Sequence, residues 1–300
     1  MQKLSYVVLN KLIERHVTSA EIDVLLYVSR YQNTQGVAEG MYYKDVCEDL
    51  DISYQTFYDA KDGLVSKGII AVDKINYFDN DIKILDNDFS DSKMYQKGYI
   101  NTNHELFACK QFRMMKAGAK LLAMDLMKNN LTSGRSYHCN TKNFHETFMR
   151  KLDICKRTLQ HYMKELKLLF YIGVKDRQYW IKIRAFAEKR QSKNENQKYR
   201  ENSINVAIRR NRIKKEKVRK EDVTELDNLL KRYNREISDE EVIGGVFSLS
   251  KIIENSIKVI NAGKEKKMWK RSLKPTLVHR ILRKTLGMDV RDLPYDIELV

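Results

Sequence analysis

The sequence LDISYQTF occupies residues 50–57, and the similar sequence LDICKRTL occupies residues 152–159. The two stretches are related by an offset of 102 residues, and Leu64 matches Leu166 at the same offset. In the first stretch the Asp-Ile pair is typical of a turn, and Ser53 is a favoured N-terminal cap for the helix that follows. A repeat of this kind predicts that the chain contains two copies of one structural module.

Outward from residues 50–57, helical periodicity, capping residues and short apolar runs predict the elements of the first copy. They are a helix over 18–31, an extended piece at 41–43, a short helix over 44–50, a helix over 54–67, and two strands at 69–72 and 81–85. The first helix begins with a capping box from Thr18 to Glu21, and Gly68 ends the last one. The two strands are expected to form a β-hairpin.

The second copy repeats this order around residues 152–159. Its elements are a helix over 112–129, a strand at 136–139, a helix over 142–151, a helix over 156–170, and a hairpin with its tip at 175–177 and its second strand at 179–183. Helix, strand, helix, turn, helix and hairpin is the order of a winged helix-turn-helix. The sequence therefore predicts a mainly α fold with small β-hairpin wings, in which two winged helix-turn-helix domains precede a helical C-terminal region.

Charge and pattern predict where the domains begin and end. Residues 1–98 are expected to form an acidic winged-helix domain for protein contact or dimerisation, and residues 99–188 a basic winged-helix domain for DNA binding. Residues 189–236 are expected to be a basic linker or arm, because they are polar and charged. Residues 237–300 are expected to be a helical domain, with a capping box at Ser238, an apolar stripe over 242–260 and a last helix between Pro275 and Gly287.

Charge is distributed unevenly along the 300 residues, whose formal net charge is +16. Residues 1–100 carry 11 basic and 16 acidic side chains, whereas residues 101–188 carry 17 basic and 7 acidic ones. Residues 189–220 carry a further 13 basic and 3 acidic side chains. The basic excess after residue 100 is larger than solubility requires and indicates a polyanionic partner, which we expect to be double-stranded DNA.

Membrane and secreted classes are disfavoured. No run of 18 apolar residues occurs, and charged residues interrupt the N-terminal hydrophobic residues, so neither a membrane span nor a signal peptide is expected. We expect a cytoplasmic protein, associated with the nucleoid or a plasmid, with no membrane partner. The four cysteines are too few and too scattered for a disulfide scaffold, so reduced thiols are expected.

Catalytic and metal sites are also disfavoured. The chain has no glycine-rich phosphate loop of either standard kind, so we expect no catalytic residue and no cofactor. Five histidines and cysteines lie near one another in sequence, but none has the paired spacing that places two zinc ligands on one face. They are His138, Cys139, His145, Cys155 and His161. No metal site is predicted, and these side chains are interpreted as structural or surface residues.

DNA-binding residues are predicted in the second winged helix, whose third helix would enter the major groove. On the outward face of that helix lie Lys156, Arg157, Gln160, His161 and Lys164, and at the wing lie Lys175, Arg177 and Lys182. Arg157 and Gln160 can make the bidentate contacts that distinguish guanine and adenine. The alternative interpretation is that these charges only keep a helix surface solvated.

The corresponding helix of the first copy has a different character. It carries Asp59 and Asp62 where phosphate contacts would be made, which favours contact with protein. Tyr54, Gln55 and Tyr58 could still read bases if the rest of the molecule anchors the duplex, and they form a secondary DNA-binding prediction.

A strongly basic block covers residues 209–220, where eight of the twelve residues are Lys or Arg. We expect an arm that contacts phosphates, because such a segment would repel itself as a free helix and would release counterions on DNA. Its expected DNA-binding residues are Arg209, Arg210, Arg212, Lys214 and Lys215. A plain linker is the alternative.

With the motifs at 50–57 and 152–159, residues 4–186 resemble tandem winged helix-turn-helix DNA-binding proteins. Among these, the chain is similar to the plasmid-type replication initiators of low-GC Gram-positive bacteria, their plasmids or phages. The resemblance implies that one domain mediates dimerisation or reads a partial site, while the other binds the repeated origin sequence. It implies a homodimer that binds double-stranded DNA sequence-specifically in replication initiation or replisome loading, with replisome proteins as further partners.

Two other functions stay open. A dimeric transcriptional regulator would bind one palindrome and could dimerise through a helix over 238–262, with transcription proteins as partners. A winged-helix adaptor would use both domains for protein contact, but it would not need the basic block at 209–220.

Overall fold

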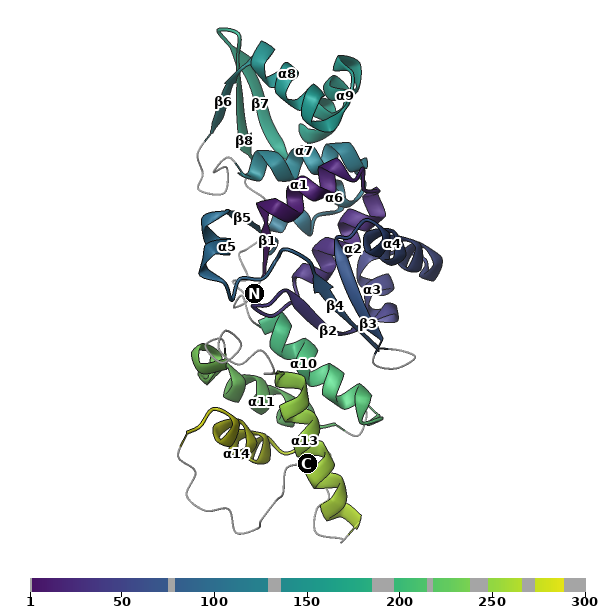
Figure 1. The fold of residues 1–300 in the computed structure, drawn as a ribbon, viewed down its shortest axis with the longest axis vertical. Helices are drawn as coiled ribbons and strands as arrows, with labels where there is room; N and C mark the ends of the chain where they lie inside the picture. Colours follow the sequence, from purple (N-terminus) through teal and green to yellow (C-terminus); the bar gives the residue numbers. More distant parts are fainter. Residues whose placement is uncertain are drawn as a thin grey trace.

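The computed structural model describes residues 2–74, 79–128, 136–184, 197–214, 218–237, 248–265 and 273–288. These residues form an elongated, mostly helical molecule with small antiparallel sheets, as expected (Figure 1). Figure 1 shows residues 117–183 at the top, residues 19–84 in the middle and the C-terminal helices at the bottom. We call these parts the second repeat unit, the first repeat unit and the C-terminal unit.

The first repeat unit combines helices with a three-stranded sheet. Its described elements are α2 (Ser19–Ser29), β2 (Val37–Tyr42), α3 (Tyr43–Leu50), α4 (Tyr54–Ser66), β3 (Ile70–Lys74) and β4 (Asp79–Ile84). The strands lie in the order β2-β4-β3 and pair antiparallel. The expected capping box of α2 is present, because Thr18 Oγ1 accepts from the Glu21 backbone N–H and the Glu21 carboxylate accepts from the Thr18 backbone N–H.

The second repeat unit has the same order of elements. They are α7 (Ala117–Lys128), β6 (Tyr137–Asn140), α8 (Thr141–Leu152), α9 (Lys156–Leu166), β7 (Phe170–Lys175) and β8 (Gln178–Ile183). The strand order β6-β8-β7 corresponds to β2-β4-β3. Between the two units lie α5 (Ser92–Gln96), β5 (Tyr99–Asn101), the short 3-10 helix η1 (Glu105–Phe107) and α6 (Lys110–Arg113).

The turn that precedes the last helix has the same conformation in both units. Asp51 (φ 55°) and Asp153 (φ 50°) are both left-handed, which ends α3 and α8, and Asp adopts this conformation more readily than most residues. In the first unit Ser53 Oγ then accepts from the Thr56 backbone N–H at 3.1 Å and caps α4. The repeated Leu-Asp-Ile sequence therefore forms the same left-handed turn between two helices in both units.

Two helices near the second unit differ from expectation. The single helix expected over 112–129 is two helices, α6 and α7, because the chain turns at residues 114–116. Phe112 and Met115 are both buried beside this turn, and the Met115 carbonyl accepts a hydrogen bond from the Ser19 hydroxyl at 3.1 Å. The helix expected over 156–170 ends at Leu166, since Leu169 and Phe170 turn into the core as β7 begins.

One hydrophobic core is common to both repeat units and extends from Leu4 to Ile181. Its central helix is α7, in which residues 119–127 are all buried. Both α1 (Tyr6–Glu14) and α2 pack against α7. A helix that is buried on all sides belongs to the interior of a larger domain.

Polar and strand contacts also cross the expected boundary at 98/99. Lys120 of α7 is fully buried, and its Nζ lies 2.6 Å from each carboxylate oxygen of Asp23 on α2. The strand β1 (Lys3–Ser5) pairs antiparallel with β5. The two domains expected at 1–98 and 99–188 are therefore joined through one core rather than separate.

The C-terminal unit consists, in its described residues, of α10 (Gln197–Arg210), α11 (Lys220–Arg232), α13 (Leu249–Glu265) and α14 (Pro275–Thr285). These helices enclose a second hydrophobic cluster. The prediction of a linker over 189–236 is wrong for the described residues of this range. They form α10 and α11, which bury residues such as Ile204 and Leu226 in this cluster. The last helix agrees with expectation, since it begins at Pro275 and Gly287 (φ 63°) follows its end.

The apolar stripe expected over 242–260 is buried in the same cluster as far as the structure describes it. Ile253 and Ile257 of α13 are fully buried against the neighbouring helices. Val242, Val246 and the capping box at Ser238 lie outside the described residues. The apolar side of α13 is therefore covered by the other helices of the C-terminal unit, and it is not available for contact with a second copy of the chain. Among the helices described, none combines the length and the apolar character that crossing a membrane requires.

Candidate nucleic-acid interface

The candidate interface is built on α9 of the second repeat unit. One side of this helix is buried in the core through Leu159, Met163 and Leu166, whose spacing is that of an amphipathic helix. The opposite side carries the five predicted reading residues, all of them exposed: Lys156, Arg157, Gln160, His161 and Lys164. The structure thus gathers them on one outward face.

A single acidic side chain of α9, Glu165, lies beside this face. His161 Nε2 is 3.1 Å from Glu165 Oε1, one turn along the helix, and Glu165 Oε2 also accepts from the Lys116 backbone N–H at 3.4 Å. These contacts hold Glu165 at the C-terminal, inner end of α9. The N-terminal end, with Lys156 and Arg157, keeps its positive charge, as a surface that meets phosphates requires.

Cys155 stands at the N-terminal cap of α9 and is exposed. Its Sγ lies 3.2 Å from Thr158 Oγ1, and this hydrogen bond lowers the pKa of the thiol. Of the other cysteines, Cys47 is buried, while Cys109 and Cys139 are partly buried. Cys155 is therefore a natural chemical reporter for anything that covers the start of α9.

The predicted wing residues occupy two places. Asp176 (φ 52°) and Arg177 (φ 58°) form the tip of the β7–β8 hairpin, in the backbone conformation of a tight two-residue turn. Lys175 and Arg177 are exposed at this tip. Lys182, in contrast, lies on the outer face of the sheet, since its neighbour Ile181 is buried in the core that α9 shares. Lys182 is therefore separated from the reading face of α9.

The first repeat unit presents tyrosines on α4, where the second presents cations on α9. Tyr54 is 54% exposed, and the rings of Tyr54 and Tyr58 pack against Tyr43, with centroids 5.2 and 6.1 Å away. Gln55 is exposed and donates from Nε2 to Asp59 Oδ1 at 2.7 Å.

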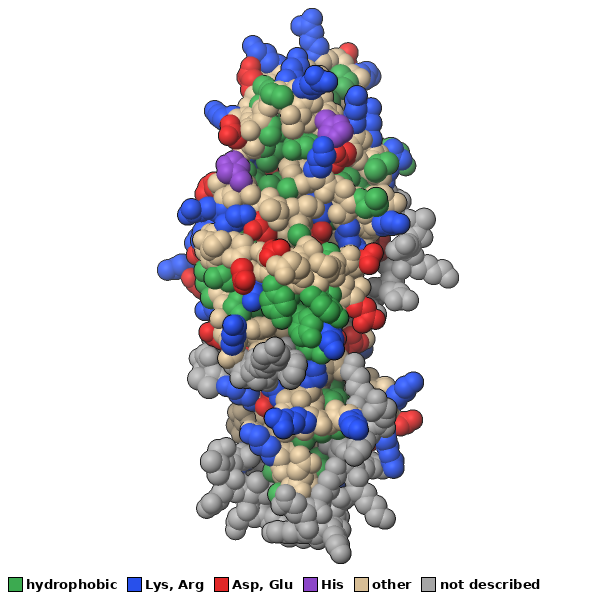
Figure 2. All heavy atoms as spheres, turned by 90° about the vertical axis from the view of Figure 1, so that its right-hand side faces the viewer, with side chains coloured by type: hydrophobic (Ala, Val, Ile, Leu, Met, Phe, Trp, Pro, Cys, Tyr) green, Lys and Arg blue, Asp and Glu red, His purple; other side chains and the backbone are tan. Residues whose placement is uncertain are grey.

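Figure 2 shows the side of the molecule on which Figure 1 places α4 and α9. Lys and Arg side chains are numerous in its upper part, over the second repeat unit. Hydrophobic and acidic side chains gather at mid-height, over the first repeat unit. The difference in charge between the two units is therefore exposed on a single face.

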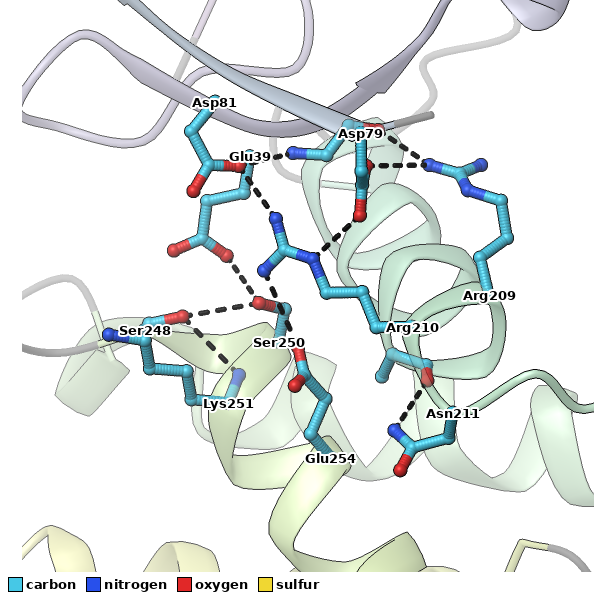
Figure 3. A network of polar contacts seen from close by, with 12 residues as sticks. Glu39, Asp79, Asp81, Arg209, Arg210, Asn211, Ser248, Ser250, Lys251 and Glu254 are labelled. Carbon is cyan, nitrogen blue, oxygen red and sulfur yellow. Dashed lines mark hydrogen bonds and ion pairs between the residues drawn. The ribbon is translucent and has the colours of Figure 1, made fainter. Parts of the chain in front are cut away.

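The basic block at 209–220 is not one exposed arm. Arg209 and Arg210 are the last residues of α10, and both bind carboxylates of the first repeat unit (Figure 3). Arg210 places Nε 2.6 Å from Asp79 Oδ2, Nη2 2.8 Å from Asp81 Oδ1, and Nη1 3.5 Å from Glu254 Oε1. Burial alone would lower the pKa of Arg210, but the hydrogen bond to Asp79 and the charges of Asp81, Asp79 and Glu254 outweigh it and raise that pKa.

Arg209 makes a parallel set of contacts with the same edge of the first unit. Its Nη1 lies 2.9 Å from Asp45 Oδ2, its Nη2 donates to the Gly40 carbonyl at 2.5 Å, and its guanidinium carbon lies 5.1 Å from the centre of the Tyr42 ring. The approach is close, because a Cβ at Gly40 would lie 2.2 Å from a methyl group of Val206. Arg209 and Arg210 therefore hold the C-terminal unit in place, which removes them from the predicted DNA-contacting arm.

The rest of the predicted arm is described only in part. Arg212 and Lys214 follow α10 and are exposed. Lys215 lies outside the described residues. The exposed part of the block thus begins at Arg212.

Sequence reasoning did not single out Trp180 and Tyr171, two aromatic residues on the outer face of the β6-β8-β7 sheet. Trp180, Tyr171 and His138 are all exposed there. The sequence could have predicted their position, because successive residues of a strand point to opposite faces of the sheet. Trp180 is followed by the apolar Ile181, and Tyr171 is preceded by the apolar Phe170.

Within the described ranges, no three His, Cys, Asp or Glu side chains are grouped closely enough to hold a metal ion. Comparison of the chain with protein-family models, with curated proteins and with solved structures gives no match. The function is therefore inferred from the charges and side chains of the exposed surfaces.

Proposed function

We propose that this chain binds double-stranded DNA sequence-specifically, with α9 in the major groove and the tip of the β7–β8 hairpin against the backbone. The main support for this proposal is the outward face of α9. Arg157 and Gln160 are exposed there beside lysine side chains, and the opposite face of the helix packs in the core. Arginine and glutamine at such positions make the bidentate base contacts that specify sequence. We assign both repeat units to the winged helix-turn-helix class, on the basis of their element and strand order.

The proposed role is replication initiation or replisome loading on a bacterial or mobile-element replicon, in a homodimer or larger assembly. Two unlike repeat units support it, because the basic unit would bind the origin while the tyrosines of α4 would contact a protein partner. A transcriptional regulator that dimerises through residues 238–262 has less support, since the described part of that stripe is already buried. DNase I footprinting on the neighbouring DNA tests the role: an array of adjacent protected repeats is expected, and one protected palindrome would indicate a regulator instead.

Arg157→Ala is expected to weaken binding to the cognate duplex by about 1–3 kcal/mol and to relax the preference at one base position. The loss follows from the removal of one bidentate base contact. Competition binding against a set of single-base variants of the site measures both quantities. Lys110→Ala is the control, because Lys110 is exposed on α6, outside the second repeat unit. Unchanged affinity together with an unchanged preference would remove Arg157 from the reading face.

Duplex DNA is expected to protect Cys155 from alkylation. The thiol is exposed at the start of α9 and its pKa is lowered, so it should be the fastest-reacting cysteine of the free protein. Mass spectrometry of peptides after brief maleimide treatment, with and without the cognate duplex, gives the extent of protection, and Cys109 serves as the internal reference. Equal labelling of Cys155 in both samples would place the duplex elsewhere.

A further inference from the structure

We propose that the outer face of the β6-β8-β7 sheet binds single-stranded DNA, whose unpaired bases stack on Trp180 and Tyr171. This goes beyond the duplex contact proposed for α9, because the sheet and α9 lie on opposite sides of the second repeat unit (Figure 1). The choice of DNA over RNA rests on that proposed function, in which the same repeat unit binds DNA through α9.

The register of the sheet places a row of side chains across its outer face. His138 of β6 pairs with Trp180 of β8, and Trp180 pairs with Gly173 of β7. Trp180 is 46% exposed, and the His138 ring packs edge-on against it with centroids 4.0 Å apart. The indole is thus supported on the β6 side and presents its exposed surface to solvent.

Gly173 leaves the β7 side of the indole open. A Cβ at this position would meet no atom within 4 Å, so no packing contact requires a glycine here. Its φ also lies outside the left-handed range that favours glycine. A glycine inside a strand weakens the strand and often marks a place where a ligand approaches closely. Here the open position is directly opposite Trp180, which is where a stacked base would enter.

The charges around this row favour a polyanion that carries flat rings. Tyr171 is 57% exposed, pairs with Lys182 across the strands, and has the guanidinium carbon of Arg184 4.5 Å from its ring centre. Lys167 borders the same shallow groove. None of the outward residues of the three strands is acidic: His138, Asn140, Tyr171, Gly173, Lys175, Gln178, Trp180 and Lys182.

Single-stranded DNA matches both features of this surface. Its phosphates suit Lys182, Arg184 and Lys167, and its unpaired bases suit the two exposed rings, a combination typical of proteins that bind single strands. The bases of a duplex are already stacked on one another and cannot reach these rings. An acidic peptide would match the cations but would leave the open position beside Trp180 unexplained.

The test uses the full chain and a labelled oligothymidine of about 16 nucleotides, with fluorescence anisotropy as the readout. Trp180→Leu is expected to weaken binding roughly 5- to 150-fold, whereas Trp180→Phe, which keeps a ring, retains most of the affinity. Gly173→Val is expected to weaken binding similarly by filling the open position, without loss of thermal stability, because valine suits a strand better than glycine. Val174→Thr, which alters an exposed neighbour on the opposite face of β7, is the matched control and should bind normally.

Tryptophan fluorescence adds a direct readout of stacking. Oligothymidine should quench the emission of the wild-type protein, and Trp180→Phe should remove this quenching even though the sequence has a second tryptophan, Trp269. Unchanged oligothymidine affinity in both Trp180→Leu and Gly173→Val, or quenching that persists in Trp180→Phe, would overturn the proposal. Tighter binding of oligouridine than of oligothymidine would overturn the assignment to DNA.

Two further measurements separate this proposal from its alternatives. Trp180→Leu should leave duplex affinity unchanged, and Arg157→Ala should leave oligothymidine affinity unchanged, so each surface can fail without the other. Analytical ultracentrifugation without DNA checks whether a second copy covers the sheet. Self-association of the wild type that is lost in Trp180→Leu would make this face a protein interface and would overturn the proposal.

Discussion

Replacing Lys120 with methionine is expected to lower the free energy of unfolding of the full chain by about 3–5 kcal/mol. Lys120 is 0% exposed, and its Nζ lies 2.6 Å from both carboxylate oxygens of Asp23. The substitution leaves the Asp23 carboxylate, whose side chain is 13% exposed, without its ion-pair partner, while methionine preserves most of the apolar volume of the lysine stem. Urea unfolding followed by circular dichroism measures the loss.

This loss should depend on pH in a defined direction. Burial raises the pKa of Asp23, and Lys120 opposes that rise, so the pKa rises further when the cation is removed. The folded variant then binds a proton at a pH where the unfolded chain is still ionised at this position. Its stability relative to the wild type should therefore recover as the pH falls from about 8 to about 5.

The matched control is Lys116→Met, which alters an exposed lysine just before α7. It should change the free energy of unfolding by less than about 0.5 kcal/mol. The double variant Asp23→Leu/Lys120→Met should regain much of the lost stability, because an apolar pair often replaces a buried ion pair without a net cost. A deficit in Lys120→Met that stays constant from pH 8 to pH 5 would contradict this account of the pair.

Arg210→Ala is expected to cost about 3–5 kcal/mol and to loosen the C-terminal unit from the first repeat unit. Arg210 is only 10% exposed, and its removal leaves Asp79, Asp81 and Glu254 close together without a shared cation. Burial raises the pKa of Glu254, and the charge and hydrogen bond of Arg210 oppose that rise, so removal of Arg210 should raise the pKa of Glu254 further. Urea unfolding measures the cost, and faster amide hydrogen exchange in α10 locates it.

Arg212→Ala is the control for this prediction, because Arg212 belongs to the same basic block and is exposed. Its effect on stability should stay within about 0.5 kcal/mol. If Arg212 contacts a phosphate, the slope of log K against log salt for duplex binding should flatten by about 0.9. Equal destabilisation by the two substitutions would mean that the network in Figure 3 does not hold the units together.

Local features of the fold could be predicted because their causes lie within a few residues. The capping box at Thr18, the turns at Asp51 and Asp153, and the Pro275 and Gly287 boundaries each follow from side-chain chemistry next to the backbone concerned. The five exposed residues of α9 belong to the same category, since their spacing alone puts them on one helix face.

Contacts between distant parts of the chain could not be predicted in this way. Arg210 and Asp81 are 129 positions apart, and the sequence shows an acidic and a basic region without saying that they pair. Their opposite charges are equally compatible with an exposed arm. Similarly, the apolar residues of α7 show a buried helix, but only the three-dimensional packing shows that both repeat units bury it together.

Because α7 is packed into both repeat units, α4 and α9 behave as parts of one body, with a fixed separation and a fixed rotation between them. A duplex that touches both helices must present its two contacted segments a set number of base pairs apart. Inserting about five base pairs, half of a helical turn, would carry the second segment to the far side of the duplex. The DNA would then have to untwist or bend, at a cost set by its own sequence, so the affinity of such a complex would depend on the spacing of the two segments.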